Sequence, residues 1–359
     1  IDLHAQYFAY RELERAYKEF SAGDQTPKSA SLVALDVETG EVIAMASYPS
    51  FNPNDRRNLK PQYTRNRPVV DLYEPGSTVK AFTISAGLES GKFTPETPID
   101  ASSRRVMIQG HWVEDVHNYG QIDVTRVITK SSNVGASQIA LAVGAERMLS
   151  MFHRVGFGDM SNIQFPGEPV GRMLDVNDKK QFELATLSFG YGLSVSSLQL
   201  AQAYAVIAAG GVKRQVTFEK QNGFVPGEQV IDPKIARQVT SMLETVVSAE
   251  GTAIKAKVPG YRVAGKTGTV HKTAASGGYE ADEYRSVFCG FAPVSHPKIA
   301  MVVMIDDPKT GAYYGGVVAA PVFSRVMSNL LRVMNVPPDD VQDPSKSLVV
   351  LNPQKTNRL

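Results

Sequence analysis

The sequence predicts an α+β fold in which one antiparallel sheet is built from both ends of the chain. Apolar, β-rich runs lie near the start, within residues 31–48, and again near the end, within residues 261–305. The segments between them are mostly helical, which favours a helical subdomain inserted into a sheet subdomain. We expect the sheet subdomain over about residues 1–50 and 250–334, and the helical subdomain over about residues 73–250.

The first elements follow from apolar spacing and breaker residues. Leu3 to Phe20 carries apolar residues at helical spacing and ends before a Gly-Asp-Gln-Thr-Pro breaker, which predicts an amphipathic helix. Ser31–Val37 and Glu41–Tyr48 are joined by Glu38-Thr39-Gly40, which indicates a hairpin. Apolar periodicity then predicts helices at Ser77–Glu89, Ser132–Leu149, Ser196–Ala209, Pro233–Ser248 and Ala320–Met334.

Three more strands are predicted in the last hundred residues, at Tyr261–Val270, Arg285–Val294 and Ile299–Ile305. The segment His271–Tyr284 is charged, contains Ser276-Gly277-Gly278 and is too long for a tight turn. We therefore expect a mobile loop there, beside whatever site the strands carry. Residues 335–359 are rich in Pro and Asp, which is typical of a flexible tail.

The composition excludes several classes of protein. With 359 residues, 43% apolar and 21% charged, the chain is long enough to bury a core and is not disordered. A net charge of +2 gives no sign of nucleic-acid binding. Its single cysteine excludes an internal disulfide, and its six histidines lack paired ligand spacing, so no metal or cofactor is expected. Leu184–Val212 is uncharged but interrupted by glutamines, serines and glycines, so we interpret it as a buried helix with its approach loop.

One motif formally matches a phosphate-binding loop. Gly260 to Thr267 fits the pattern GxxxxGKT, and Ile299–Asp306 resembles an apolar strand that ends in a magnesium-binding aspartate. The mechanism requires a loop of backbone amides that leads into a helix. Here the residues after Gly260 are strand-like and continue into Gly268-Thr269-Val270. A nucleotidase is therefore only a distant alternative.

Ser77 and Lys80 could form a nucleophile and its base. Three residues apart at the start of a predicted helix, they lie on one face, so the lysine could accept the serine proton. Lysine acts as a base only when neutral, and burial or a second cation, for which Lys266 is the candidate, must lower its pKa. Taken alone, Ser77 could equally be a helix cap and Lys80 a solvated charge.

Two further motifs carry polar groups suited to the same cleft. Ser131 and Asn133 flank one residue, so a hydroxyl and an amide could face a substrate, although the alternative is an N-cap of the next helix. On the later strand, a cation and hydroxyls could bind a carboxylate while a glycine permits close backbone approach, although this could also be an ordinary polar edge strand. These strand residues are Lys266, Thr267, Gly268 and Thr269.

The three motifs occur in the order Ser77-Thr-Val-Lys80, Ser131-Ser-Asn133 and Lys266-Thr-Gly-Thr269, which resembles the penicillin-binding transpeptidases. The resemblance covers roughly Leu32 to Met334. It is closest to the monofunctional class B enzymes of the division-specific Gram-negative type, with the elongation type as nearest competitor. It implies a penicillin-binding transpeptidase and serine β-lactamase-like fold over residues 1–334. Other stretches that carry it are Ile1-Asp-Leu-His-Ala-Gln, Tyr73-Glu-Pro-Gly, Lys130-Ser-Ser-Asn-Val-Gly135 and Tyr314-Gly-Gly-Val-Val-Ala-Ala-Pro-Val322.

The resemblance implies a role for each motif. Ser77 would attack the D-Ala-D-Ala bond of a peptidoglycan stem peptide, Lys80 would take its proton, and a neighbouring stem's amine would resolve the acyl-enzyme during septal wall synthesis. Proton movement and binding of the acyl side chain would fall to Ser131 and Asn133. The terminal carboxylate would be held by Lys266, Thr267 and Thr269, and the backbone N–H groups of Ser77 and Thr269 would form the oxyanion hole. β-Lactam antibiotics would be covalent inhibitors.

Partners and location are also implied only by the resemblance. Glycan-polymerising and other divisome membrane proteins would be partners of the full-length form, at the periplasmic face of the bacterial inner membrane. The class B membrane anchor and pedestal domain are absent from this sequence, which starts at Ile1 without a signal-like segment, so we expect a fragment.

The sequence departs from the family pattern at the middle motif, where Ser-Ser-Asn replaces Ser-Asp-Asn and removes an acidic side chain. No second-base loop of a β-lactamase is identifiable, and Glu168 in Pro166-Gly-Glu-Pro is expected to be structural. Without a base for deacylation, a penicilloyl-enzyme should persist. A β-lactam sensor or a β-lactamase with the same fold remains the alternative.

Overall fold

The computed structural model describes residues 1–55, 57, 59–273 and 278–340. Its strands are β1 (Ser29–Asp36), β2 (Val42–Tyr48), β3 (Pro98–Ala101), β4 (Arg105–Ile108), β5 (His111–Glu114), β6 (Gly120–Asp123), β7 (Arg172–Met173), β8 (Leu193–Ser194), β9 (Val212–Lys213), β10 (Glu228–Gln229), β11 (Ala264–Thr273), β12 (Tyr279–Ala292) and β13 (Ile299–Asp306). Its α-helices are α1 (Leu3–Glu19), α2 (Arg67–Val70), α3 (Lys80–Glu89), α4 (Val124–Lys130), α5 (Asn133–Val143), α6 (Ala145–Arg154), α7 (Gln181–Leu187), α8 (Ser197–Ala208), α9 (Pro233–Val246), α10 (Gly315–Val318) and α11 (Ala320–Val333). Short 3-10 helices are η1 (Pro61–Tyr63), η2 (Gly76–Val79) and η3 (Ile254–Ala256).

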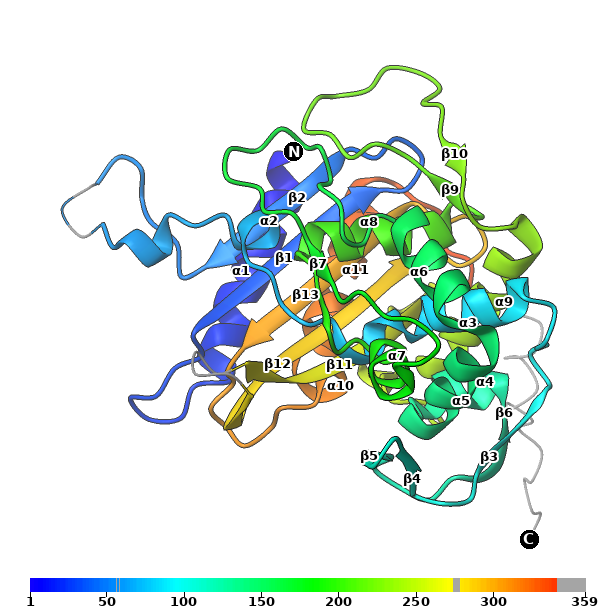
Figure 1. The fold of residues 1–359 in the computed structure, drawn as a ribbon. Coiled ribbons are helices and arrows are strands. Elements are labelled where there is room, and N and C mark those ends of the chain that lie inside the picture. Colours follow the sequence, from blue (N-terminus) through cyan, green and yellow to red (C-terminus); the bar gives the residue numbers. More distant parts are fainter. Residues whose placement is uncertain (56, 58, 274–277, 341–359) are drawn as a thin grey trace, which may run out of the picture.

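The main sheet has five antiparallel strands in the order β11-β12-β13-β1-β2, so the first and last parts of the chain complete one sheet (Figure 1). β13 pairs with β1 at the seam between them, with Val33 opposite Val302. All eight residues of β13 are buried, which explains its uninterrupted apolar run. The predicted α+β fold with a sheet from both chain ends is confirmed.

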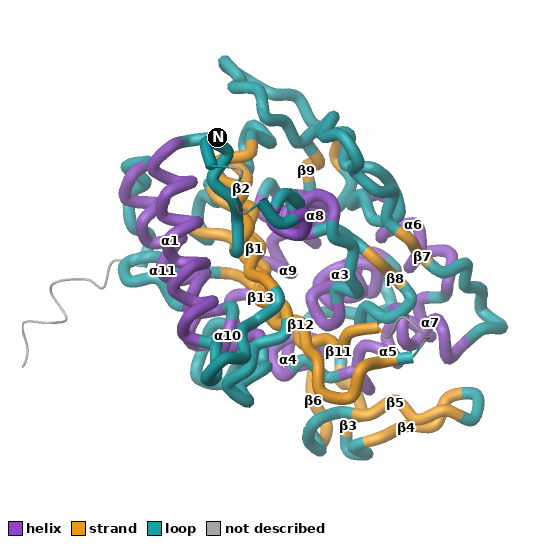
Figure 2. The backbone as a smooth tube through the Cα atoms, turned by 90° about the vertical axis from the view of Figure 1, so that its left-hand side faces the viewer, coloured by secondary structure: helices purple, strands orange, loops and turns teal. Residues whose placement is uncertain are grey.

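Helices cover both faces of this sheet. α1 and α11 pack together on one face, and α8 lies on the other (Figure 2). α1 begins at a cap, because the Asp2 carboxylate accepts the N–H of Ala5, and it buries a stripe of small and apolar residues spaced three or four apart. The stripe is Ala5, Ala9, Leu13 and Ala16.

α8 is the buried helix expected within Leu184–Val212. Eleven of its twelve residues are buried, and a capping box between Ser196 and Gln199 starts it. Gly190 and Gly192 lie in the approach loop. Within the described part of the chain, no helix is both long and apolar enough to cross a membrane.

The predicted helix Ser132–Leu149 is wrong as a single element, because the chain breaks it into α5 and α6. Gly144 lies between them with φ +90°, a backbone conformation that ends a helix and suits glycine. The side chain of Asp178 then accepts the N–H of Ala145 at 2.8 Å and starts α6. The apolar pattern continues through the break, which is why periodicity alone missed it.

The predicted mobile loop His271–Tyr284 is also largely wrong. β11 and β12 continue as a long hairpin, with His271 opposite Tyr284 and Thr273 opposite Tyr279. Residues 274–277 lie outside the described residues. The aromatic ring of Tyr284 stacks on Tyr313 with centroids 4.2 Å apart, so side chains on neighbouring segments support a strand where charge and glycine content suggested a loop.

Residues 335–340 pack against the body, so the predicted flexible tail does not begin at 335. The Tyr261 hydroxyl donates to the carbonyl of Val336 at 2.6 Å, and the carboxylate of Asp339 accepts the N–H groups of Arg262 and Ser295. The rest of the expected tail, 341–359, lies outside the described residues.

The middle of the chain holds the predicted helices together with four two-stranded ribbons that the sequence did not predict, β3–β6, β4–β5, β7–β8 and β9–β10. Strands of two to four residues are too short to give a clear alternating pattern. One apolar core runs from α1 through α3, α5, α8 and α9 to α11. Because this core joins both expected subdomains, their division into a sheet subdomain and a helical subdomain stays a prediction.

Candidate active site

Ser77 lies on the short 3-10 helix η2, which is held between the edge strand β11 and the loop before β8. Gly76 has φ +56°, and a side chain on Gly190 would come within 2.3 Å of the Gly76 backbone, so this loop packs directly on the turn. On the other side, a side chain on Gly268 would come within 2.9 Å of Thr78. Ser77 is thus half-buried on a turn that is packed between Gly190 on one side and Gly268 on the other.

Lys80 begins α3 one turn beyond Ser77 and is fully buried. Its Nζ lies 2.9 Å from Oγ of Ser77, as the helical spacing predicted. It also lies 2.7 Å from the carbonyl oxygen of Ser131 and 2.7 Å from Oδ1 of Asn133. One amine is therefore surrounded by the hydroxyl of the candidate nucleophile and by two oxygen acceptors.

The pKa of Lys80 is well below its ordinary value. Burial is the largest cause, since removing the ammonium from water disfavours the charged form. The nearby cation Lys266 lowers the pKa further, and the carboxylate of Asp115 opposes both effects. The expected dependence on Lys266 is therefore present, but it is secondary to burial.

Ser131 and Asn133 lie at the junction of α4 and α5. Ser131 adopts the left-handed conformation with φ 62° and ψ 40°, and its hydroxyl oxygen lies 3.2 Å from Nζ of Lys80. Ser132 between them is the N-cap of α5, and its hydroxyl accepts the N–H of Gly135 at 2.8 Å. The cap and the site therefore coexist, because the cap uses the middle residue while the flanking side chains contact Lys80.

Lys266 enters the same cluster from β11. Its Nζ donates to Oγ of Ser131 at 2.9 Å, so this hydroxyl lies between two lysine amines. The Lys266 side chain is fully buried, and burial lowers its pKa to about 7. The Ser131 hydroxyl therefore lies between two buried amines whose pKa values are both lowered.

The remaining strand residues take different positions. Thr267 is buried and its hydroxyl pairs with that of Thr252 at 2.8 Å. Thr269 is half-buried, and its hydroxyl accepts the N–H of Gly315 at 3.0 Å. Gly268 between them permits the close contact with η2. Of the two threonines expected to face a carboxylate, only Thr269 is partly accessible.

Asp115 is a component of the site that sequence reasoning missed. It follows β5 and is only 3% exposed. Its carboxylate accepts the hydroxyl of Ser132 and the N–H groups of Asn133 and Val134. The missing acid of the Ser-Ser-Asn motif was a signal that a carboxylate could come from elsewhere, but the sequence does not say from where.

Two alternative readings fail on this geometry. Gly265, Lys266 and Thr267 lie inside β11 rather than in a loop before a helix, so the phosphate-loop interpretation is wrong. The carboxylate of Glu168 accepts the N–H of Ser161 at 2.7 Å, and among the described residues it contacts none of the site residues. This agrees with its expected structural role.

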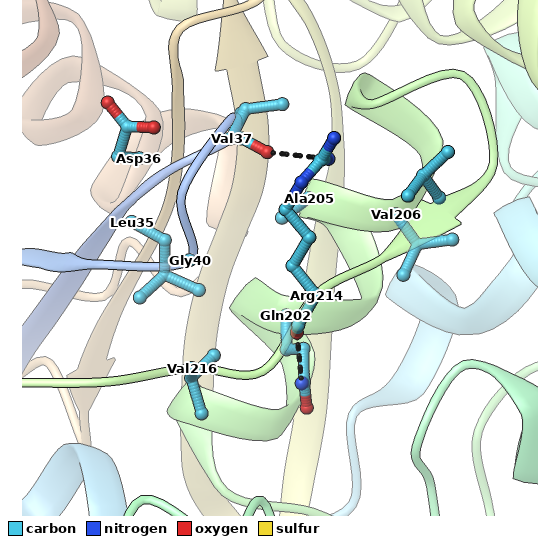
Figure 3. Close-up of a pocket in the computed structure, with 10 residues that line it drawn as sticks. Leu35, Asp36, Val37, Gly40, Gln202, Ala205, Val206, Arg214 and Val216 are labelled. Carbon is cyan, nitrogen blue, oxygen red and sulfur yellow. Dashed lines mark hydrogen bonds between the residues drawn. The ribbon is translucent and has the colours of Figure 1, made fainter. Parts of the chain in front are cut away.

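A small pocket elsewhere in the molecule lies between the β1–β2 turn and α8 (Figure 3). The Arg214 guanidinium donates to the carbonyl of Val37 at 3.2 Å, and Gln202 donates to the carbonyl of Arg214 at 2.9 Å. None of the residues of the Ser77 cluster lines it. These contacts tie α8 to the sheet, and the pocket carries no reactive group of the site.

Over the described residues, no group of histidine, cysteine or acidic side chains is arranged to hold a metal.

The fold and the meeting of all three sequence motifs around Lys80 and Ser131 match the class of domain that the motifs resemble, the penicillin-binding transpeptidases. The family described as penicillin binding protein transpeptidase domain matches residues 30–328, and the chain belongs to that family.

Individual relatives agree with this assignment. The chain is 40% identical over 352 residues to peptidoglycan D,D-transpeptidase FtsI of Escherichia coli K12, covering 98% of this chain and 58% of that protein. It is 41% identical over 343 residues to the probable peptidoglycan D,D-transpeptidase PbpC of Pseudomonas aeruginosa, covering 96% and 60%. It is 38% identical over 338 residues to the probable peptidoglycan D,D-transpeptidase PenA of Neisseria flavescens, covering 94% and 82%. The chain thus spans about three fifths of the length of FtsI and PbpC.

Solved structures show the same fold. The TP domain of penicillin-binding protein 3 from Burkholderia pseudomallei superposes with a TM-score of 0.84 at 39% identity, covering 94% of this chain and 97% of that chain. The predicted resemblance to division-type class B penicillin-binding proteins is therefore confirmed at the level of the family.

Proposed function

We propose that this chain is the catalytic domain of a peptidoglycan D,D-transpeptidase of septal wall synthesis, acting through an acyl-enzyme on Ser77. The observation that carries the proposal is the buried amine of Lys80 at 2.9 Å from Oγ of Ser77. A serine hydroxyl needs a base within hydrogen-bond reach, and a lysine with a lowered pKa is such a base at neutral pH.

The contacts of Lys80 suit its neutral form. A neutral amine has two N–H donors and one lone pair. The two donors match the oxygens of Ser131 and Asn133 at 2.7 Å, which leaves the lone pair for the hydroxyl proton of Ser77. The amine is thus oriented before the substrate arrives, so the proton transfer needs little rearrangement.

Acylation then proceeds by addition and elimination. Oγ of Ser77 adds to the carbonyl carbon of the penultimate D-alanine while its proton passes to Lys80. The C–N bond to the last D-alanine breaks, and its nitrogen takes a proton returned through the lysine and Ser131 hydroxyl cluster. The backbone N–H groups of Ser77 and Thr269 are assigned to the oxyanion. Losing one such donor costs on the order of 100- to 1,000-fold in rate.

The second half-reaction forms the crosslink. The amine of a neighbouring stem peptide adds to the ester carbonyl, loses its proton to Lys80, and displaces Oγ of Ser77, which regains a proton. The terminal carboxylate of the donor stem, and that of a β-lactam, is assigned to Lys266 with Thr267 and Thr269. Gly268 lets η2 pack directly on β11, and the donor peptide would pair along β11, which is the edge strand of the main sheet among the described strands.

Partners and location are part of the proposal and rest on the family resemblance. The substrates are peptidoglycan stem peptides, and β-lactams are covalent inhibitors. In the full-length protein, a membrane anchor would place this domain at the periplasmic face of the bacterial inner membrane, beside glycan-polymerising and other divisome proteins. A division role is favoured over an elongation role by the 40% identity to FtsI.

The test is the intact mass of the protein after incubation with a penicillin, for the wild type and for Ser77→Ala. We expect a stable adduct of one drug molecule on the wild type and none on the variant. No adduct with intact drug would refute the proposal, and no adduct with hydrolysed drug would indicate a β-lactamase. Turnover of a D-Ala-D-Ala thioester then separates a transpeptidase from a sensor, which would acylate without turnover.

A further inference from the structure

A buried carboxylate behind the Ser131–Asn133 turn has no part in the chemistry proposed above. Asp115 lies just beyond β5, is 3% exposed, and accepts three hydrogen bonds. The Ser132 hydroxyl donates to Oδ2 at 2.6 Å. The backbone N–H groups of Asn133 and Val134 donate to Oδ1, the second at 3.1 Å. These are two of the first N–H groups of α5, which no carbonyl of the helix can satisfy.

The backbone of Asp115 is itself held in place. Its N–H donates to the carbonyl of Arg104 at 2.8 Å, and the guanidinium of Arg104 donates back to the carbonyl of Asp115 at 3.1 Å. The end of the β4–β5 ribbon is therefore joined to the start of α5 through one side chain. A second link runs from the amide of Asn133 to the carbonyl of Glu114 at 3.0 Å.

The turn that Asp115 holds is strained and faces Lys80. Ser131 is in the left-handed conformation, which costs a residue with a Cβ roughly 1 kcal/mol or more. Ser131 and Asn133 together direct three oxygens at Nζ of Lys80, while the side chain of Ser132 points the other way to Asp115. Asp115 thus binds the side of the Ser131–Asn133 turn that faces away from Lys80, and the opposite side of the turn orients the Lys80 amine.

Asp115 also supplies negative charge to a positively charged cluster. Lys80 faces Lys266 from β11 and Asp115 from the end of β5, and these two charged groups shift the pKa of Lys80 in opposite directions. Asp115 itself is faced by Arg104 of the preceding loop, by Tyr119, and by the positive N-terminal end of α5. The carboxylate therefore offsets part of the charge that two buried lysines would carry.

We propose that Asp115 is a positioning residue for acylation: it holds the Ser131–Asn133 turn against Lys80 and offsets the charge of the lysine pair. This inference rests on the proposed acyl transfer at Ser77. It acts through the turn and the lysine, and Asp115 does not touch the reacting atoms.

The test compares Asp115→Asn with a matched control, Asp178→Asn. Asp178 makes the same kind of contact at the start of α6, where it accepts the N–H of Ala145 at 2.8 Å, but it is exposed and contacts no site residue. We expect the second-order rate of Ser77 acylation by a fluorescent penicillin to fall by about 10- to 100-fold in Asp115→Asn, as misplaced catalytic groups do. The control should stay within about twofold of the wild type.

The pH profile of acylation distinguishes positioning from folding. The rate rises with pH as Lys80 loses its proton, and a neighbouring carboxylate favours the protonated form. Asp115→Asn should therefore move the acid limb of the profile to lower pH, and Asp178→Asn should leave it in place. An unchanged rate, or a reduced rate with an unmoved acid limb, would overturn the proposal and leave Asp115 a residue of the fold alone.

A second variant covers the case in which Asp115→Asn does not fold. Ser132→Ala keeps the carboxylate and removes one of its three donors. We expect it to acylate at least about fivefold more slowly with an unmoved acid limb, and a wild-type rate would overturn the proposal. The wild type serves to separate the two hypotheses, since failure of the wild type to form an adduct refutes the acyl transfer and not the role of Asp115.

Discussion

Replacing Lys266 by methionine tests the electrostatics of the lysine pair. The substitution keeps a long, unbranched side chain inside β11 and removes the amine that donates to Ser131. Burial lowers the pKa of Lys266 to about 7 in the folded chain, whereas an exposed lysine has a pKa of 10.5. Folding therefore carries a cost at neutral pH, where the unfolded chain binds a proton that the folded chain partly releases.

The sign and size of the effect follow from linkage. Because the folded pKa is the lower one, stability rises with pH between about 7 and 10.5, where the unfolded state holds more protons. Between pH 7 and pH 9 this contribution is worth up to about 2 kcal/mol. Lys80 contributes in the same direction in both proteins, but less in the variant, because Lys266 no longer lowers its pKa there. The difference between the two proteins therefore reports Lys266 together with its effect on Lys80. The variant should be the more stable protein at pH 7, and the gap should narrow toward pH 9.

The assay is urea unfolding of the wild type and Lys266→Met at pH 7, 8 and 9, together with the acylation rate at each pH. We expect the rate of acylation by the penicillin to fall by about 10- to 100-fold, because the carboxylate of the drug loses the cation assigned to bind it. Its acid limb should move to higher pH, because Lys266 no longer lowers the pKa of Lys80. If both proteins gain the same stability between pH 7 and pH 9, Lys266 does not titrate in the folded chain as argued.

Two further predictions concern packing around the site. Gly268→Ala places a Cβ 2.9 Å from Thr78 and 3.0 Å from the carbonyl of Pro75, so η2 must shift. We expect a loss of about 1–3 kcal/mol in urea unfolding and at least a tenfold slower acylation, and a wild-type rate would contradict this reasoning. Cys289 is fully buried and burial raises its pKa, so a thiol reagent should react in urea but not with the folded chain. Rapid reaction of the native thiol would show that β12 opens.

Much of the fold could be read from the sequence because its signals are local. The hairpin at Glu38-Thr39-Gly40 follows from turn residues between two apolar runs, and Gly40 does adopt a positive φ of 75°. The buried helix α8 follows from its apolar run. In contrast, the break at Gly144 and the extension of β11 and β12 depend on contacts with distant residues, Asp178 and Tyr313 among them.

The candidate site divides in the same way. The spacing of Ser77 and Lys80 along one helical turn determines that they can meet, so the sequence alone predicts that pair. It also orders the three motifs in a way that resembles one family. The sequence does not predict that the Ser131 hydroxyl lies between Lys80 and Lys266. That position depends on α3, the end of α4 and β11 packing together in the folded chain.

The sequence by itself determined the class of fold, the family resemblance and the residues expected at the site. Only the tertiary structure decided how the site is charged and held. Asp115 reaches the turn from a ribbon that precedes it by sixteen residues, and both lysines owe their low pKa first to burial, which is a property of the packed chain. A short motif specifies neither how deeply its side chains will be buried nor which distant residues will pack beside them.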